Sequence, residues 1–89
     1  MPLYHFHAEN GRCFLDPDGL ELPDVEAAKR EAVQFMVDSL RDDTRLLWDT
    51  RSYRVIVTDE ADMTLFTLDL SACLAPVLKA TRENPMGAR

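Results

Sequence analysis

Apolar and polar residues alternate near both ends of the chain, which is typical of half-buried β-strands. Near the start, Leu3–Glu9 and Arg12–Asp16 flank Asn10-Gly11, a pair that favours a tight hairpin turn because both residues tolerate a positive φ. A two-residue loop would pair Ala8 with Cys13 and His7 with Phe14. The core face would then carry Tyr4, Phe6, Ala8, Cys13 and Leu15, and the other face His5, His7, Phe14 and Asp16.

A second hairpin is predicted from Tyr53–Asp59 and Met63–Leu70, with a two-residue loop at Ala61-Asp62. This register sorts the apolar residues onto one face. The inner pairs are Val57 with Phe66, Val55 with Leu68 and Tyr53 with Leu70. The outer pairs are Arg54 with Asp69, Ile56 with Thr67 and Thr58 with Leu65.

Between the hairpins, the hydrophobic period changes to that of a helix. Pro23-Asp24 suits a helix start, and the periodic pattern runs to about Asp42. The predicted inner face consists of Val25, Ala28, Ala32, Phe35, Met36 and Leu40. Leu20–Leu22 reads as an extended lead into this helix. Residues 43–52 form a connection in which Trp48 is expected to cover one end of the core.

Together these elements predict an α+β fold of two layers, in which one main helix covers a four-stranded antiparallel sheet. The order is ββαββ, followed by a short helical turn within 71–80, where Pro76 forbids a longer helix. At 89 residues the chain has room for one domain. We assign residues 1–78 to it and expect 79–89 to be a flexible tail.

Charge and composition narrow the range of functions that the chain can have. Sixteen acidic residues against ten basic ones give a net charge of −6, which argues against nucleic-acid binding because phosphates need a basic surface. No apolar run is long enough to span a membrane, and the N-terminus does not resemble a signal peptide. We therefore expect a cytoplasmic protein with Cys13 and Cys73 as reduced thiols, a disulfide between them being the alternative.

The chain resembles a family of short, uncharacterised bacterial domains of unknown function. The residues that carry the resemblance, within 2–72, are Tyr4-His5-Phe6-His7, Asp18-Gly19, Leu22-Pro23-Asp24, Glu26-Ala27-Ala28, Trp48, Val57-Thr58-Asp59-Glu60 and Leu65-Phe66-Thr67-Leu68. One departure lies in the second turn, where the family usually has Gly and this chain has Asp62. The resemblance implies no reaction, ligand or catalytic residue.

His5 and His7 are the chain's only histidines. They share one strand face, with Asp16 opposite, so a metal site built from His5, His7 and Asp16 is one hypothesis. Ordinary half-exposed strand histidines, or part of an interface, are the alternative. Asp16-x-Asp18-Gly19 echoes the start of a calcium loop, but the further oxygen ligands are missing, which favours a solvated turn. No nucleophile lies beside a base, so we expect neither an enzyme nor a cofactor.

The sheet face without the helix would carry an apolar patch, which is either a set of scattered surface residues or an interface. The candidate interface residues are Phe14, Ile56, Leu65, His5 and His7. Our leading hypothesis is an interaction or regulatory module that acts through this open face or a strand edge, with a protein partner or as a homodimer. An antitoxin-like component, suggested by fold alone, and a small metal-binding protein using His5 and His7 are the alternatives.

Overall fold

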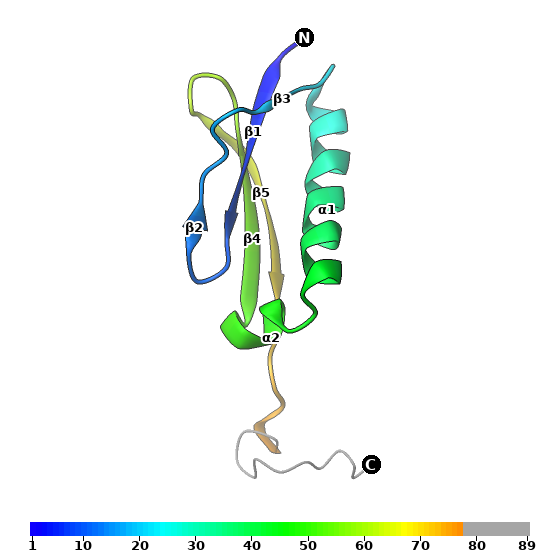
Figure 1. The fold of residues 1–89 in the computed structure, drawn as a ribbon, viewed down its shortest axis with the longest axis vertical. Coiled ribbons are helices and arrows are strands. Elements are labelled where there is room, and N and C mark those ends of the chain that lie inside the picture. The colour runs from blue at the N-terminus through cyan, green and yellow to red at the C-terminus, as the bar shows by residue number, and fades with distance from the viewer. Residues whose placement is uncertain (78–89) are drawn as a thin grey trace.

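The chain forms an antiparallel sheet with a long helix packed against one face, as Figure 1 shows for a computed structural model that describes residues 1–77. The elements are β1 (Leu3–Glu9), β2 (Cys13–Phe14), β3 (Leu20–Glu21), α1 (Val25–Asp42), α2 (Leu46–Thr50), β4 (Ser52–Thr58) and β5 (Thr64–Ser71). The predicted α+β class, with an antiparallel sheet and one main helix, is confirmed. None of the helices in this part of the chain has the length and apolar character needed to cross a bilayer.

The sheet has five strands rather than the predicted four, in the order β2-β1-β4-β5, with β3 also paired to β1. The extra strand is the segment that the sequence predicted only as extended. It pairs Tyr4 with Leu20 and Leu3 with Glu21, beyond the end of the first hairpin. A strand of two residues is too short for the alternation of apolar residues to reveal it. The centre of the sheet is the antiparallel pair β1 and β4.

The core lies between α1 and the two central strands. Its buried apolar residues are Tyr4, Phe6, Ala8, Ala28, Ala32, Met36, Tyr53, Val55 and Val57. The Asp24 side chain caps the helix by accepting a hydrogen bond from the Ala27 amide at 2.9 Å. Ala28 and Ala32 are fully buried, and their small side chains let the helix backbone approach the sheet closely. The predicted helix bounds and most of its inner face are confirmed, but Val25 is exposed.

The register predicted for the first hairpin is wrong by one residue. Ala8 pairs with Phe14 and Glu9 with Cys13, so the loop spans Asn10–Arg12, with Gly11 at φ 97°. A third loop residue turns every following side chain to the other face. Phe14 therefore lies on the helix side, not on the open face. Cys13 is exposed instead of buried, and its thiol, like that of Cys73, is free.

Strand β2 ends at Phe14, so the segment after it leaves the ladder. Leu15, which the sequence placed in the core, is 72% exposed. The alternation rule fails here because it applies only while the chain remains paired in a sheet.

The register predicted for the second hairpin is confirmed at five of its six pairs. The exception is Thr58, which pairs with Thr64 rather than Leu65 because a β-bulge interrupts β5. The turn is one residue longer than predicted: the Asp62 amide donates to the Asp59 carbonyl, and the Asp59 amide to the Met63 carbonyl, both at 3.0 Å. Asp62 has a φ of 65°, a conformation that Gly adopts without steric cost, so Gly would suit this position better than Asp.

The connection between α1 and β4 also differs from the prediction. It contains the short helix α2, and Leu46 and Leu47 pack against the core, whereas Trp48 is 53% exposed. Successive helical residues point about 100° apart, so Trp48 turns outward when the two leucines face inward. Of the predicted C-terminal turn, only Pro76 and Val77 are seen in helical conformation. Ser71 belongs to β5 and residues 72–75 are irregular, whereas residues 78–80 and the predicted tail at 79–89 lie outside the described residues.

The conformation of Asp62 gives a stability test. Asp62→Gly should raise the free energy of unfolding by about 0.5–1 kcal/mol, because Gly adopts a positive φ without steric cost. Urea unfolding followed by circular dichroism measures the change. Ala61→Gly, at a loop position without positive φ, is the matched control and should lower stability by a similar amount. Equal effects of the two substitutions would contradict this explanation of the turn.

Candidate functional site

The outer edge of β1 has a gap in its middle. Strand β2 pairs with Ala8 and Glu9, and β3 pairs with Leu3 and Tyr4, but no strand lies opposite Phe6. A buried amide without a partner would cost about 1–3 kcal/mol. The Asp16 carboxylate fills this gap, because its Oδ2 accepts a hydrogen bond from the Phe6 amide at 3.1 Å.

The second oxygen of the same carboxylate shapes the chain that returns from β2 to β3. Asp16 Oδ1 accepts hydrogen bonds from the amides of Asp18 and Gly19, at 3.2 and 3.1 Å. Partial burial on its own raises the pKa of Asp16, but the amides of Phe6, Gly19 and Asp18 and the nearby His5 ring outweigh this effect. The pKa of Asp16 therefore lies below its usual value, and the carboxylate is charged at neutral pH.

The two histidines hold the backbone of the same residue. The Asp16 amide donates to His7 Nδ1 at 3.0 Å, and the Asp16 carbonyl lies 2.9 Å from His5 Nδ1. In an antiparallel sheet, the amide and the carbonyl of one residue both bond to a single residue of the neighbouring strand. The two rings, parallel within 2° and with centroids 6.1 Å apart, thus take the place of a strand partner.

These contacts assign the protons on the rings. His7 Nδ1 accepts from an amide, so its proton is on Nε2, which donates to the buried Thr58 hydroxyl at 3.1 Å. His5 Nδ1 faces a carbonyl, which only accepts, so His5 carries a proton on Nδ1. Every buried side-chain nitrogen or oxygen in the described residues has a partner.

His5, His7 and Asp16 are neighbours, but the two rings contact the Asp16 backbone, and its carboxylate binds backbone amides. A histidine binds a metal through an unprotonated nitrogen. Both nitrogens of His7 are engaged, which leaves His5 Nε2 as the nitrogen of the pair without a partner. No group of three potential metal-binding side chains occurs within residues 1–77. The geometry therefore gives His5, His7 and Asp16 a structural role.

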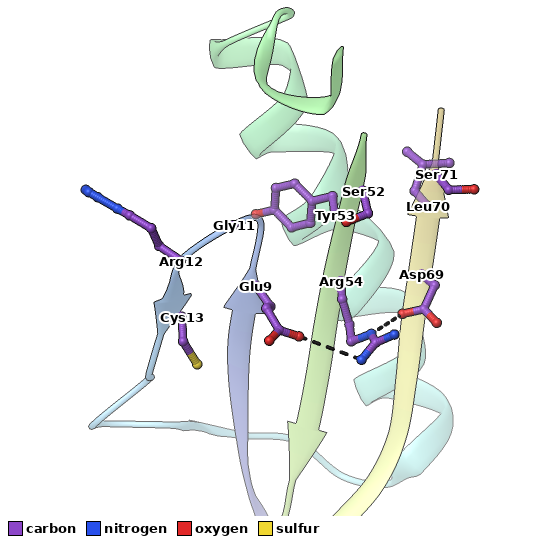
Figure 2. Close-up of a pocket in the computed structure, with 10 residues that line it drawn as sticks. All are labelled: Glu9, Gly11, Arg12, Cys13, Ser52, Tyr53, Arg54, Asp69, Leu70 and Ser71. Atoms are coloured by element: carbon purple, nitrogen blue, oxygen red, sulfur yellow. Dashed lines mark hydrogen bonds and ion pairs between the residues drawn. The ribbon is translucent and has the colours of Figure 1, made fainter. Parts of the chain in front are cut away.

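A shallow groove crosses the other end of the open face, and Figure 2 shows Arg54 between two carboxylates within it. Arg54 Nε lies 2.7 Å from Asp69 Oδ1, and Arg54 Nη1 lies 3.7 Å from Glu9 Oε1. The hydrogen bond and charge of Asp69 raise the pKa of Arg54. These exposed ion pairs connect β1, β4 and β5, and Arg12, which also lines the groove, offsets the charge of the second carboxylate. The groove thus presents no excess of either sign to a ligand.

The predicted interface residues do not form one surface. His5, His7 and Ile56 lie on the open face and are partly buried, whereas Leu65 lies at the bulge, 40% exposed, and lines a pocket with Tyr4 and Val25. Phe14 lies on the opposite face. Only a loose group of apolar side chains therefore remains on the open face.

A different feature of the sheet is open to partners, namely the outer edge of β5. Within the described part of the chain, β5 pairs only with β4. The Ala72 amide donates to the Arg51 carbonyl at 3.0 Å, so by alternation the backbone groups of Leu70, Leu68 and Phe66 also point towards β4.

The backbone groups of the intervening residues Thr67, Asp69 and Ser71 point away from the sheet. Side-chain chemistry could not reveal these donors and acceptors. The available signal was the length of the second alternating segment, together with its lack of Pro and Lys.

The fold and site define a small α+β domain with one bare strand edge and a polar cluster that serves its own structure. A protein-family model described as "Domain of unknown function (DUF6894)" matches residues 3–71, and the chain belongs to this family. Neither the curated proteins nor the solved structures gave a match. The resemblance to an uncharacterised domain family is thus confirmed.

The Asp16 cluster predicts an acid-dependent loss of stability. Asp16→Asn should lower the free energy of unfolding by about 1–3 kcal/mol at pH 7, because an amide group accepts fewer hydrogen bonds than a carboxylate. The folded-state pKa is depressed, so the stabilisation is present above the unfolded value of about 3.9 and is lost as the pH falls through the lower folded value.

Urea unfolding of both proteins between pH 7 and pH 2.5 measures this effect, and the difference between them should shrink below about pH 4. Asp18→Asn is the matched control, because the Asp18 carboxylate is exposed and only its amide contributes to the turn. A difference that stayed constant throughout the acid range would contradict the role given to the Asp16 charge.

Proposed function

We propose that this domain is a non-enzymatic protein-interaction module that binds its partner by strand addition at the outer edge of β5. In strand addition, an extended segment of the partner continues the sheet, with affinity from main-chain hydrogen bonds and specificity from alternate side chains. The single observation that carries the proposal is the outer edge of the eight-residue strand Thr64–Ser71, which has no strand partner among residues 1–77.

The contrast between the two edges of the sheet supports this proposal. The edge formed by β2 and β3 consists of two-residue strands separated by a turn that contains Pro17, and between them the Asp16 carboxylate accepts the Phe6 amide of β1. Such features prevent unwanted pairing. On β5 the one charged side chain, Asp69, is bound to Arg54, and the bulge lies at the start of the strand. Most of that edge therefore has no equivalent protection.

The remaining polar groups support a role without catalysis. The two histidines and Asp16 direct their hydrogen bonds to the backbone of the fold and to Thr58. Arg54 is engaged by two exposed carboxylates, those of Glu9 and Asp69. Of the ring nitrogens in this cluster only His5 Nε2 is left without a partner among the described residues, and a base of this kind would still need a nucleophile beside it for covalent catalysis.

Proline substitutions on β5 test the proposal, because they remove one backbone amide at a time. Thr67→Pro removes an outward amide, so it should lower the free energy of unfolding by less than about 1.5 kcal/mol. Leu68→Pro removes an amide that points to β4 and should cost about 3 kcal/mol or more. Thermal and urea unfolding distinguish these two results.

Affinity purification of the tagged chain from cells that carry its gene tests the binding itself. Proteins enriched by the wild type should be lost with Thr67→Pro and retained with Thr67→Val, which keeps the amide. Retention of every partner by a folded Thr67→Pro variant would refute strand addition at β5.

A further inference from the structure

Resting on the proposed function, we infer that the partner of the β5 edge is a second copy of this chain. The two β5 strands pair in antiparallel orientation about a two-fold axis that passes beside Leu68. The result is a continuous sheet through both subunits, with the two α1 helices on the same face. The argument depends on the register, the charge and the apolar side chains of β5.

The register follows from symmetry. In a two-fold antiparallel pair, one residue of the strand lies opposite its own copy. Centring on Asp69 would place two like charges directly opposite each other, which is destabilising. Centring on Phe66 or Thr67 would bring the bulged residue Leu65 into the new ladder, opposite Thr67 or Asp69 respectively.

Centring on Leu68 keeps the two Asp69 carboxylates apart and moves Leu65 to the end of the ladder, opposite Ser71. The outward amide and carbonyl of Thr67 then face those of Asp69 in the partner subunit. Two-fold symmetry produces the same pair a second time, which gives about four main-chain hydrogen bonds. Asp69 Oδ1 binds Arg54, and its Oδ2 can accept from the Thr67 hydroxyl across the axis. On the helix side, Leu68 faces its copy and Phe66 faces Leu70, pairs that gain from mutual burial.

Charge explains why a chain of net charge −6 can associate with itself at this place. Self-association of an acidic protein is opposed by repulsion unless the contact surface is close to neutral. The only charged residue of β5 is Asp69, and Arg54 neutralises it at 2.7 Å. The β5 edge is therefore a part of the surface on which two copies can approach without bringing unpaired charges together.

The helix supplies more apolar surface beside the new contact. Glu31 and Phe35 line a groove with β1 and the segment after β2. Val33 and Val37 lie about 160° around the helix from Phe35, so they face away from that groove, and they are 50% and 44% exposed. With both helices on one face of a continuous sheet, these flanks border the two-fold axis and add to the area that a stable dimer requires.

Sedimentation velocity of the full chain, from about 5 to 500 μM, tests the assembly across the range expected for a typical specific dimer. The wild type and Thr67→Val should sediment as a dimer, and Thr67→Pro should sediment as a folded monomer, with an apparent Kd raised at least about tenfold. A wild type that remained monomeric would overturn the inference, as would a dimer that persisted in the folded Thr67→Pro variant.

Disulfide trapping tests the register in a background carrying Cys13→Ser and Cys73→Ser, which removes the two exposed native thiols. Leu68→Cys should form a crosslinked dimer on mild oxidation, because the two copies lie opposite each other at a separation that a disulfide can span. Thr67→Cys is the matched control and should remain largely uncrosslinked. The reverse pattern would overturn the register centred on Leu68.

The failure of this inference is distinguishable from failure of the proposed function. A monomeric wild type whose other partners are lost with Thr67→Pro would overturn the dimer and leave strand addition standing. A monomeric wild type whose partners are unaffected by Thr67→Pro would overturn both.

Discussion

The hydrogen bond from the Phe6 amide to the Asp16 carboxylate is the contact on which the arrangement of the sheet depends. β1 is a central strand, and the three side chains it buries, Tyr4, Phe6 and Ala8, form much of the floor beneath α1. Its outer edge is paired at both ends but not in the middle. A carboxylate can accept several amides at once, so one residue closes this gap and shapes the turn that lets β3 return to β1.

Closing that edge determines where the domain can meet other proteins. A sheet that is not a barrel has two edges, and each must be protected, covered or used for binding. Here the polar residues gather at one edge, where Asp16 and the two histidines satisfy the returning chain. At the other edge, β5 keeps its outward donors and acceptors unpaired within the described structure. This asymmetry supports the proposal that one edge serves the structure and the other serves recognition.

Sequence patterns predicted the parts of the fold in which side chains alternate over long stretches. The helix, the faces of β1 and most of the β4 and β5 register follow from burial alone, because a slip of one residue would expose Val55 and Val57. The errors occur where the conformation of the backbone, rather than the burial of side chains, determines the register. Because the first loop also contains Arg12, Cys13 and Phe14 each lie on the face opposite to the predicted one. The bulge makes Thr64, rather than Leu65, the partner of Thr58. Neither event changes the hydrophobic pattern enough to be recognised beforehand.

The candidate site was harder to predict, for a related reason. His5, His7 and Asp16 were found by their side chains and do lie together, but their use is set by which backbone groups need partners. Binding at β5 would depend on the main chain in the same way. Such an edge tolerates many side chains, provided that Pro and unpaired charges are absent and that alternate residues remain apolar. Recognition through a strand edge would therefore leave almost no residue motif, because the main chain and not a set of particular side chains would carry it.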